Sequence, residues 1–413
     1  MLIWSKQFSI FLFLDSNSYD SAYSKFEFLL GVNPIFRINT IGEDALGGLK
    51  EWHGINKDWL FGHINYDYKN ALEQKLSSRH RSRGSFPVIE FFSPQIVCYI
   101  ERNREVLTIE SIGINPDAVY EDITQVFVQG NDALPELEFK CRVDQQTYLS
   151  TIDILRQHIA DGDCYEINYC CERYCEDVII DPLTVYNKLC DLSPAPFAAY
   201  YRQENDYMMC ASPERYLMKE GQTIRSQPIK GTARRDEDPK RDDENKELLE
   251  RSVKERAENV MIVDLVRNDL ARSCETGSVA VNELFGIYSF PQVHQMISTI
   301  SGKLKDAHDF TDAIRYSFPM GSMTGAPKIK VMDLIDRYEQ SRRELFSGTV
   351  GYITPAGDFD FNVVIRSLFY NAATRYLSYQ TGGAITYDSD PQQEWEEMRL
   401  KAWALEKLFT PHS

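Results

Sequence analysis

Two Glu-x-x-Glu pairs are the feature of this sequence with the clearest chemical potential. Glu255 and Glu258 stand three residues apart, and Glu394 and Glu397 repeat that spacing. Residues three apart share one face of a helix. Two helices with such faces could hold Mg²⁺ between them, because this ion takes one or two protein carboxylates and leaves positions for water and an anionic ligand. Because Glu-x-x-Glu is common, a solvated helix face is the favoured interpretation of either pair taken alone.

A lysine in an unusual setting is the second candidate. Lys230 lies between a Pro-Ile pair and a Gly-Thr pair, in the run 227–232. Pro228 and Gly231 restrict the local backbone, and Ile229 indicates partial burial. Burial lowers a lysine pKa because the charged form loses its hydration, and the neutral amine is a nucleophile. The pattern therefore predicts an uncharged, nucleophilic lysine; the alternative is a turn with an exposed lysine.

Three further side chains have types suited to acid–base or anion chemistry. Glu214 follows a Ser-Pro pair and could act as a general acid if it is buried, or otherwise cap the local backbone. Arg366 follows an apolar segment and could bind a carboxylate through two hydrogen bonds, or pair with Asp358 or Asp360. His294 stands in an apolar stretch, where a core histidine is the ordinary interpretation.

Two glycine-bearing segments resemble ligand-binding loops. The segment 319–328 contains Gly325 and precedes a helix expected to run through Ile335, while the segment 380–384 contains Gly382 and Gly383 and follows a strand. Glycine lets a backbone approach a ligand closely, and N–H groups at a helix start bind anions. Neither segment matches a P-loop, and a plain turn is the alternative for each.

Apolar periodicity predicts the elements that must position these residues. It indicates helices over 145–160, 246–270 and 392–408. Strands are expected over 8–14, 88–92, 96–100, 165–169, 349–353, 361–367 and 376–381. Acidic, proline-containing stretches at 115–122 and 131–138 are expected to be surface connections. The mixture favours an α/β or α+β body.

The bulk properties restrict the class of protein. The chain has 413 residues, of which 43% are hydrophobic, enough for a sizeable core. A formal net charge of −17 argues against nucleic acid and anionic membranes as partners, so an anionic substrate would need local cations or a metal. Nine cysteines without zinc-site spacing favour reduced thiols in a cytoplasmic protein. No apolar run has the length of a membrane span.

The order and spacing of these motifs resemble the chorismate-utilising enzymes, which include anthranilate, aminodeoxychorismate, isochorismate and salicylate synthases. The resemblance is carried by the segments 211–215, 228–232, 256–270, 318–328, 382–391 and 394–402. It is strong over residues 145–410, the expected catalytic region, and loose over residues 1–140. It implies an α+β fold of stacked, mostly antiparallel sheets flanked by helices, with a central cleft.

Within that family, Lys230 discriminates between activities. The run Pro-Ile-Lys-Gly-Thr resembles the aminodeoxychorismate branch, whereas anthranilate synthases carry alanine at the lysine position. Glu166 stands where isochorismate and salicylate synthases place a water-activating lysine. The resemblance therefore implies amination of chorismate to 4-amino-4-deoxychorismate, on the route to 4-aminobenzoate and folate. Anthranilate synthase component I and a catalytically silent regulatory or scaffolding subunit are the alternatives.

The resemblance also implies roles for individual residues. Lys230 would attack C2 of chorismate, Glu214 would protonate the departing C4 hydroxyl, and His294 would lie near the ring. Mg²⁺ would be held by Glu258 and Glu397, with Glu255 and Glu394 behind them. The residues expected to contact substrate are Arg366, Lys401, Thr232, Gly325, Gly382 and Gly383. Ammonia is expected from a glutamine amidotransferase subunit, because the chain shows no glutaminase-type Gly-x-Cys-x-Gly run.

Overall fold

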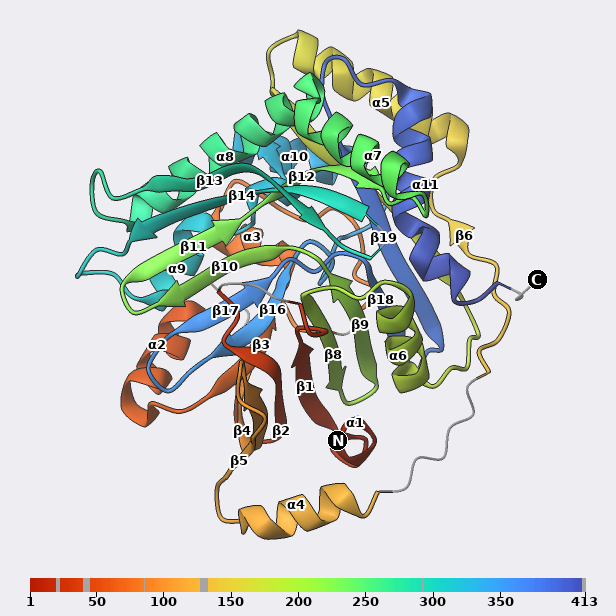
Figure 1. The fold of residues 1–413 in the computed structure, drawn as a ribbon. Helices are drawn as coiled ribbons and strands as arrows, with labels where there is room; N and C mark the ends of the chain where they lie inside the picture. The colour runs from red at the N-terminus through yellow and green to blue at the C-terminus, as the bar shows by residue number, and fades with distance from the viewer. Residues whose placement is uncertain (20–22, 40–44, 85, 127–132, 292, 411–413) are drawn as a thin grey trace.

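The computed structural model describes residues 1–19, 23–39, 45–84, 86–126, 133–291 and 293–410 (Figure 1). Its strands are β1 (Ile10–Asp15), β2 (Phe26–Ile38), β3 (Leu60–Ile64), β4 (Ile89–Glu101), β5 (Leu107–Ser111), β6 (Lys140–Cys141), β7 (Glu166–Cys175), β8 (Phe197–Gln203), β9 (Asp206–Ser212), β10 (Arg215–Glu220), β11 (Thr223–Gln227), β12 (Ile229–Arg234), β13 (Ala280–Ser289), β14 (Val293–Lys303), β15 (Gly325–Ala326), β16 (Thr349–Ile353), β17 (Phe359–Asn362), β18 (Ser367–Asn371) and β19 (Tyr376–Ile385).

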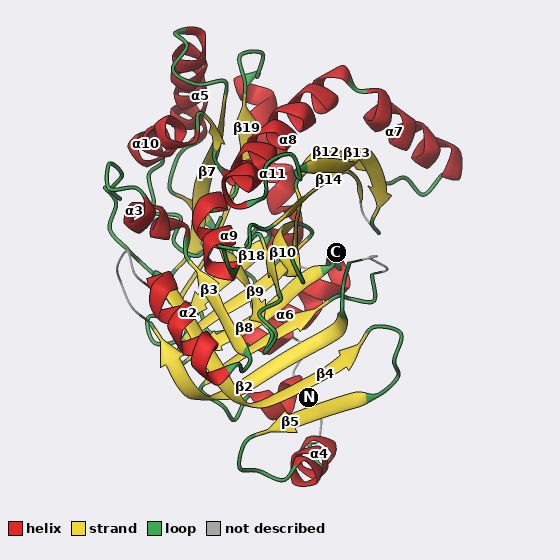
Figure 2. Cartoon of the chain, turned by 90° about the vertical axis from the view of Figure 1, so that its left-hand side faces the viewer, coloured by secondary structure: helices red, strands yellow, loops and turns green. Residues whose placement is uncertain are grey.

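The helices are α1 (Leu2–Ser5), α2 (Ala45–Asn56), α3 (Lys69–Leu72), α4 (Pro116–Thr124), α5 (Gln145–Ala160), α6 (Pro182–Leu192), α7 (Pro239–Arg251), α8 (Val253–Ser273), α9 (Phe310–Ser317), α10 (Lys328–Tyr338) and α11 (Pro391–Lys407), with 3-10 turns η1 (Tyr66–Tyr68) and η2 (Gly321–Met323). Helices α5, α7, α8, α10 and α11 gather at one end of the molecule, and α4 lies at the other (Figures 1 and 2).

Every strand pairing among the described residues is antiparallel. Followed through its hydrogen bonds, the network runs β13–β14–β11–β10–β17–β16–β3–β4–β2–β1–β8–β9–β18–β19–β7, with β12 on β14, β5 on β4, and β6 and β15 on β7. The expected α+β class with antiparallel sheets is therefore confirmed. Pairing of β1 with β8 and of β3 with β16 joins the first 140 residues to the remainder.

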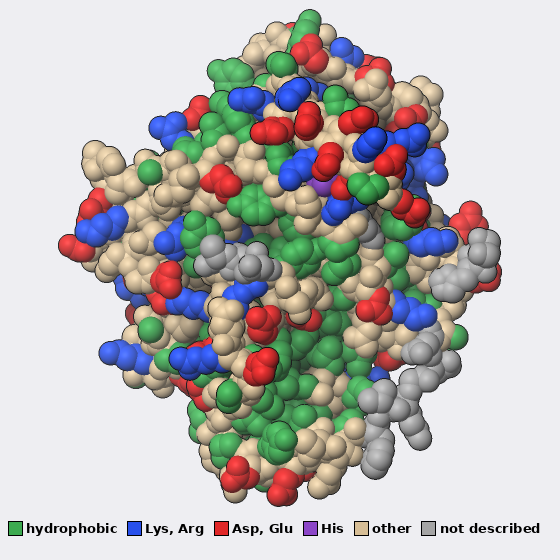
Figure 3. Space-filling model, in the orientation of Figure 1, with side chains coloured by type: hydrophobic (Ala, Val, Ile, Leu, Met, Phe, Trp, Pro, Cys, Tyr) green, Lys and Arg blue, Asp and Glu red, His purple; other side chains and the backbone are tan. Residues whose placement is uncertain are grey.

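An apolar stripe explains the position of α8. Ile262, Val263, Val266 and Leu270 recur at helical spacing, are buried, and belong to the core cluster that also contains residues of α9. The helix thereby packs on β12 and β14, and α11 packs on β19. On the face shown in Figure 3, charged side chains crowd the helix-rich half and hydrophobic ones gather over the strand-rich half.

Several expected elements are confirmed, and one long helix is wrong. The helix at 145–160 and the strand at 349–353 have the expected bounds, and α11 lies within one residue of its expected position. The helix expected over 246–270 is two helices, α7 and α8. They meet at Ser252, whose backbone is extended (ψ 115°) and whose hydroxyl accepts from the Glu255 amide. A serine N-cap ends one helix and starts the next.

Other corrections concern strand limits. The strands expected at 88–92 and 96–100 are one continuous strand, β4, and the strand expected at 361–367 is interrupted between β17 and β18. The segment 380–384 is not a loop, because it continues β19. The surface connection expected at 115–122 is largely helix α4, capped by Asn115. Of the second connection, residues 131 and 132 lie outside the described residues, and 133–138 are irregular.

Within the described residues, none of the helices combines the length and the apolar character required to cross a membrane.

A buried guanidinium connects β7 to the segment before α10. Arg343 is 2% exposed and donates to the carboxylate of Glu339, to the carbonyl of Asn168 at 2.8 Å, and to the carbonyl of Met323. Glu339 in turn accepts from the amide of Cys170 at 2.8 Å. This one ion pair therefore ties a strand to a loop that lies about 150 residues away in the chain.

We expect Arg343→Met to lower the free energy of unfolding by about 3–5 kcal/mol, because it leaves the Glu339 carboxylate buried without its partner. The control is Arg337→Met, which removes an exposed ion pair with Asp333 on α10 and should cost less than about 1 kcal/mol. Urea unfolding of both variants measures the difference. Equal losses would show that the buried pair contributes no more than a surface one.

Candidate active site

Lys230 is buried on β12 and contacts a carboxylate from another strand. It is 8% exposed, and its Nζ donates to Glu166 Oε1 at 2.5 Å. The predicted burial is confirmed, but the predicted neutral amine is wrong for this state. Burial alone would lower the pKa of Lys230, yet the carboxylates of Glu166, Glu258 and Glu214 outweigh it and hold that pKa above its ordinary value. The resting side chain is an ammonium.

Glu214 has the environment expected of a general acid. It lies in the turn between β9 and β10 and is 4% exposed. Burial raises the pKa of Glu214 to about 7, against the opposing effects of a hydrogen bond with Ser322 and the charge of Lys230. A carboxyl group with such a pKa is still partly protonated near neutral pH, unlike an ordinary glutamate, and can give its proton to a leaving group.

Arg366 supplies a cation beside Glu214. It precedes β18 with a left-handed backbone (φ 51°), and its charge opposes the rise of the Glu214 pKa. The alternative partners considered for it are occupied, because Asp358 pairs with Lys25 and Lys219 and Asp360 pairs with Arg215. A guanidinium near a protonated carboxyl group suits the binding of an anion.

The two Glu-x-x-Glu faces interact electrostatically, because the charge of Glu397 helps to raise the pKa of Glu255, and each face lies against a glycine of a strand. A Cβ on Gly231 would lie 3.0 Å from Glu255 Oε2, and a Cβ on Gly383 would lie 3.1 Å from Glu394 Oε2 and 3.7 Å from Glu397 Oε1. The absence of side chains at these glycines therefore leaves room for the carboxylates. Lys254 lies among them, since the charges of all four glutamates help to raise its pKa.

The carboxylates of this cluster repel one another. Burial raises the pKa of Glu255 and Glu394, and it raises the pKa of Glu258 to about 7, with the neighbouring acids adding to the effect. Only Glu397 has a lowered pKa, because Lys401 pairs with it at 2.8 Å. Such an excess of negative charge suits a divalent cation.

The geometry limits how such a cation could be held. Over the described ranges, no group of three or more His, Cys, Asp or Glu side chains is arranged to hold a metal ion. A pair of carboxylates is what Mg²⁺ commonly takes from a protein, with water and substrate completing its shell. The excess of carboxylates supplies the ligand type that such a magnesium site requires.

The remaining residues predicted to contact substrate lie on α11, β19, β15 and β12. The Lys401 Nζ also donates to the carbonyl of Gly382 at 3.0 Å. Gly382 and Gly383 pair with Cys170 and Tyr169 of β7 as part of β19. Gly325 lies in β15 opposite Ile167, whereas Thr232 lies exposed on β12 opposite Gln295.

His294 lies in a hydrogen-bonded cluster. Its ring nitrogens lie 2.8 Å from Ser289 Oγ and 3.0 Å from Asp242 Oδ1, and Asp242 also accepts from Arg235. These contacts fasten α7 to β13 and β14. Both ring nitrogens therefore have partners within this cluster, and the predicted place of His294 near the substrate ring stays a prediction.

Sequence reasoning did not identify three residues of the site. Glu166 contacts Lys230, Ser322 contacts Glu214, and Lys254 lies among the four glutamates. For Glu166 a signal was present, because the family resemblance compares its position with that of a lysine in isochorismate and salicylate synthases. Ser322 and Lys254 carry no such signal, because a serine in a loop and a lysine in a helix are too common to indicate a site.

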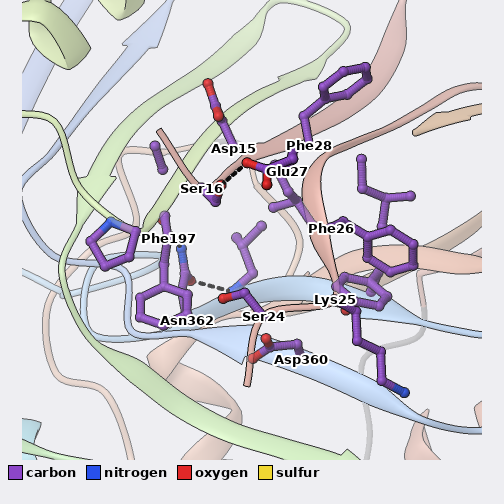
Figure 4. A pocket seen from close by; sticks show the side chains of 16 residues that line it. Asp15, Ser16, Ser24, Lys25, Phe26, Glu27, Phe28, Phe197, Asp360 and Asn362 are labelled. Atoms are coloured by element: carbon purple, nitrogen blue, oxygen red, sulfur yellow. Dashed lines mark hydrogen bonds between the residues drawn. The ribbon is translucent and has the colours of Figure 1, made fainter. Parts of the chain in front are cut away.

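A separate cavity lies on the strand-rich side of the molecule (Figure 4). Its walls come from β1, β2, the start of β8, β16 and β17, and they include Phe26, Phe197 and Asn362. Asp360 lines it and also forms the ion pair with Arg215, the residue after Glu214. The residues that line this cavity do not include Lys230, Glu214 or Glu166. The Asp360–Arg215 ion pair connects the cavity wall to the residue that follows Glu214.

Comparison with known proteins gives consistent matches. The model of the chorismate binding enzyme family matches residues 30–407. Aminodeoxychorismate synthase component 1 of Escherichia coli is 35% identical over 274 residues (66% of this chain and 60% of that one), and that of Bacillus subtilis is 34% identical over 271 residues (66% and 57%). Aminodeoxychorismate synthase of Streptomyces griseus is 41% identical over 271 residues (65% and 37%).

The match thus spans less than two thirds of the length of these curated relatives. Among solved structures, anthranilate synthase component I of Streptococcus pneumoniae has a TM-score of 0.82 at 23% identity, covering 94% of this chain and 93% of that one. The menaquinone-specific isochorismate synthase of Escherichia coli has a TM-score of 0.79 at 18% identity, covering 99% and 91%. These two structures share the fold.

Gly325→Ala should distort the strand end that carries Glu166. Gly325 has φ 140°, and a Cβ there would lie 2.1 Å from the Glu166 carbonyl oxygen. The matched control is Gly162→Ala, where φ is 82° but nothing lies within 4 Å. Both variants carry backbone strain, so thermal or urea unfolding should show an additional loss of about 1–3 kcal/mol for Gly325→Ala alone. Equal losses of unfolding free energy in the two variants would mean that β7 shifts away from the added methyl group without cost.

Proposed function

The chain belongs to the chorismate binding enzyme family, and from this premise we propose that it is the chorismate-aminating component of an aminodeoxychorismate synthase. The observation that carries the proposal is the buried cluster of Lys230, Glu214 and Glu166. The names of the matched relatives support it. The substrates would be chorismate and ammonia, and the product 4-amino-4-deoxychorismate.

The chemistry divides between a nucleophile and an acid. Lys230, once neutral, attacks C2 of chorismate, and Glu214 gives its proton to the C4 oxygen, which leaves as water. Ammonia then adds at C4 as the Lys230 amine departs from C2, and the proton that the new amine releases restores Glu214. The enolpyruvyl group remains on the ring. Arg366 and Lys401 supply positive charge for the two carboxylates of the substrate.

Magnesium is part of the proposal. Glu258 and Glu397 would hold it, with Glu255 and Glu394 nearby, and it would supply positive charge to a substrate carboxylate. The raised pKa values of Glu255, Glu258 and Glu394 support this assignment, because they report carboxylates that lack sufficient counter-charge.

A glutamine amidotransferase subunit is the proposed source of ammonia. Relatives named component 1 imply a second component. In its absence, an ammonium salt should replace glutamine, which allows the chain to be tested alone.

The function is tested with purified protein, chorismate, Mg²⁺ and an ammonium salt. We expect 4-amino-4-deoxychorismate without pyruvate release, loss of turnover with EDTA, and loss of several orders of magnitude in Lys230→Ala, because the nucleophile is removed. Lys219→Ala, which breaks an ion pair away from the site, is the control. Product analysis by mass spectrometry distinguishes the outcomes: anthranilate with pyruvate would identify an anthranilate synthase, and unchanged chorismate a silent subunit.

The pH dependence should follow Glu214. The carboxyl group must be protonated to act as an acid, so at constant free ammonia the rate should fall as the pH rises through about 7. Glu214→Gln should lower the rate by about 10²–10⁴-fold and abolish this alkaline limb. Glu396→Gln, on the exposed face of α11, is the control. An unchanged alkaline limb in Glu214→Gln would assign the acid to another group.

A further inference from the structure

The contact between Lys230 and Glu166 joins two strands that are far apart in sequence. Glu166 is 5% exposed and begins β7, and its Oε1 accepts from the Lys230 Nζ. The ammonium must lose a proton before it can attack, since only the neutral amine carries a free electron pair. Glu166 is the acceptor in hydrogen-bonding contact with that nitrogen.

The surroundings hold the Glu166 end of this contact in place. The backbone around Glu166 is fixed by two hydrogen bonds, because the Tyr165 amide donates to Ala326 O at 2.7 Å and the Asn168 amide donates to Thr324 O at 2.8 Å. Gly325 lies directly against the Glu166 carbonyl group. Arg343 braces the same strand through Asn168 O. A carboxylate fixed on a braced strand is preorganised for proton transfer.

Two other carboxyl groups influence Lys230, and neither is free to take its proton. Glu214 must carry a proton of its own to act as the acid, and burial raises its pKa to about 7, so in the reactive state it cannot accept a second proton. Glu258 acts on Lys230 through its charge and is a proposed magnesium ligand, so its lone pairs are committed to another role. Glu166 is left as the base.

We propose that Glu166 accepts the proton of the Lys230 ammonium before the amine attacks chorismate, and returns it after the amine departs. This proposal rests on the proposed function. In the first step an N–H bond of Lys230 breaks and an O–H bond forms on Glu166, which converts an ion pair into a neutral pair. The amine then attacks C2 and becomes a secondary ammonium. When ammonia displaces it, Lys230 leaves as the neutral amine and recovers its proton from Glu166.

Transfer within the pair has a kinetic consequence. The ion pair and the neutral pair contain the same number of protons, so activation of Lys230 does not depend on pH. Without the carboxylate, the ammonium must release its proton to solvent, and the rate below the lysine pKa then rises tenfold for each pH unit. A residue that only held Lys230 in position would not alter the pH profile in this way.

The first test measures formation of the Lys230–chorismate adduct by rapid quench and mass spectrometry, without ammonia, between pH 5 and 6, where Glu214 is largely protonated. We expect a flat profile for the wild type. Glu166→Gln keeps the size and the hydrogen bond, but its rate should rise tenfold for each pH unit, because its ammonium must release the proton to solvent. Glu166→Asp should recover a flat profile. A flat profile at the wild-type rate in Glu166→Gln would overturn the proposal.

A matched control removes a similar carboxylate elsewhere. Asp269 accepts from Lys328 Nζ at 2.6 Å and is 5% exposed, so Asp269→Asn also breaks a short, buried lysine–carboxylate pair. It should leave the profile of adduct formation flat. A slope of one in this variant would show that loss of any buried carboxylate produces the effect, and would overturn the assignment to Glu166.

The second test does not depend on chorismate chemistry. Reductive methylation with formaldehyde and dimethylamine-borane modifies only neutral amines, and peptide mass spectrometry reports Lys230 separately. If Glu166 holds the proton, labelling of Lys230 should begin at least about one pH unit lower in Glu166→Gln than in the wild type. The same onset in both would overturn the proposal. If the wild type leaves chorismate unchanged, the proposed function is overturned. A lower pH for the onset of Lys230 labelling in Glu166→Gln would, in that case, still establish that Glu166 pairs with the Lys230 ammonium.

Discussion

The buried guanidinium of Arg343 is the interaction on which the geometry of the site depends. It binds the carbonyl groups of Asn168 and Met323, so it fixes the distance between the start of β7 and the turn η2. The first carries Glu166 and the second carries Ser322, which contacts Glu214. The proposed base and the proposed acid are therefore positioned by one cation, which touches neither of them.

An excess of negative charge is the second property of the site. The proposed anionic substrate requires local positive charge in this acidic protein, and we assign that role to Lys230, Arg366 and Lys401. The carboxylates around them still exceed these cations, and the result is two glutamates, Glu214 and Glu258, with pKa values near 7. The same imbalance that favours a protonated acid also favours a bound dication, so a single electrostatic arrangement serves both proposals.

Features set by local periodicity could be predicted from the sequence. Helix α5, strand β16 and the two Glu-x-x-Glu faces follow from spacing alone. The break at Ser252 was missed because the polar pattern on both sides of it is continuous. The contact of Glu166 with Lys230 spans 64 residues, and no local pattern encodes it. The contact of His294 with Asp242 spans 52 residues and could not be predicted for the same reason.

The pairing of early strands with late ones has a consequence for biosynthesis. Strand β3 ends at Ile64, whereas the strand that pairs with it, β16, ends at Ile353. Strand β1 likewise pairs with β8, which is synthesised much later. At about 5–20 residues per second, a ribosome needs on the order of ten seconds or more to supply either partner. Throughout that interval the nascent chain exposes apolar strand edges, so chaperone capture during translation should govern its yield more than the stability of the finished enzyme does.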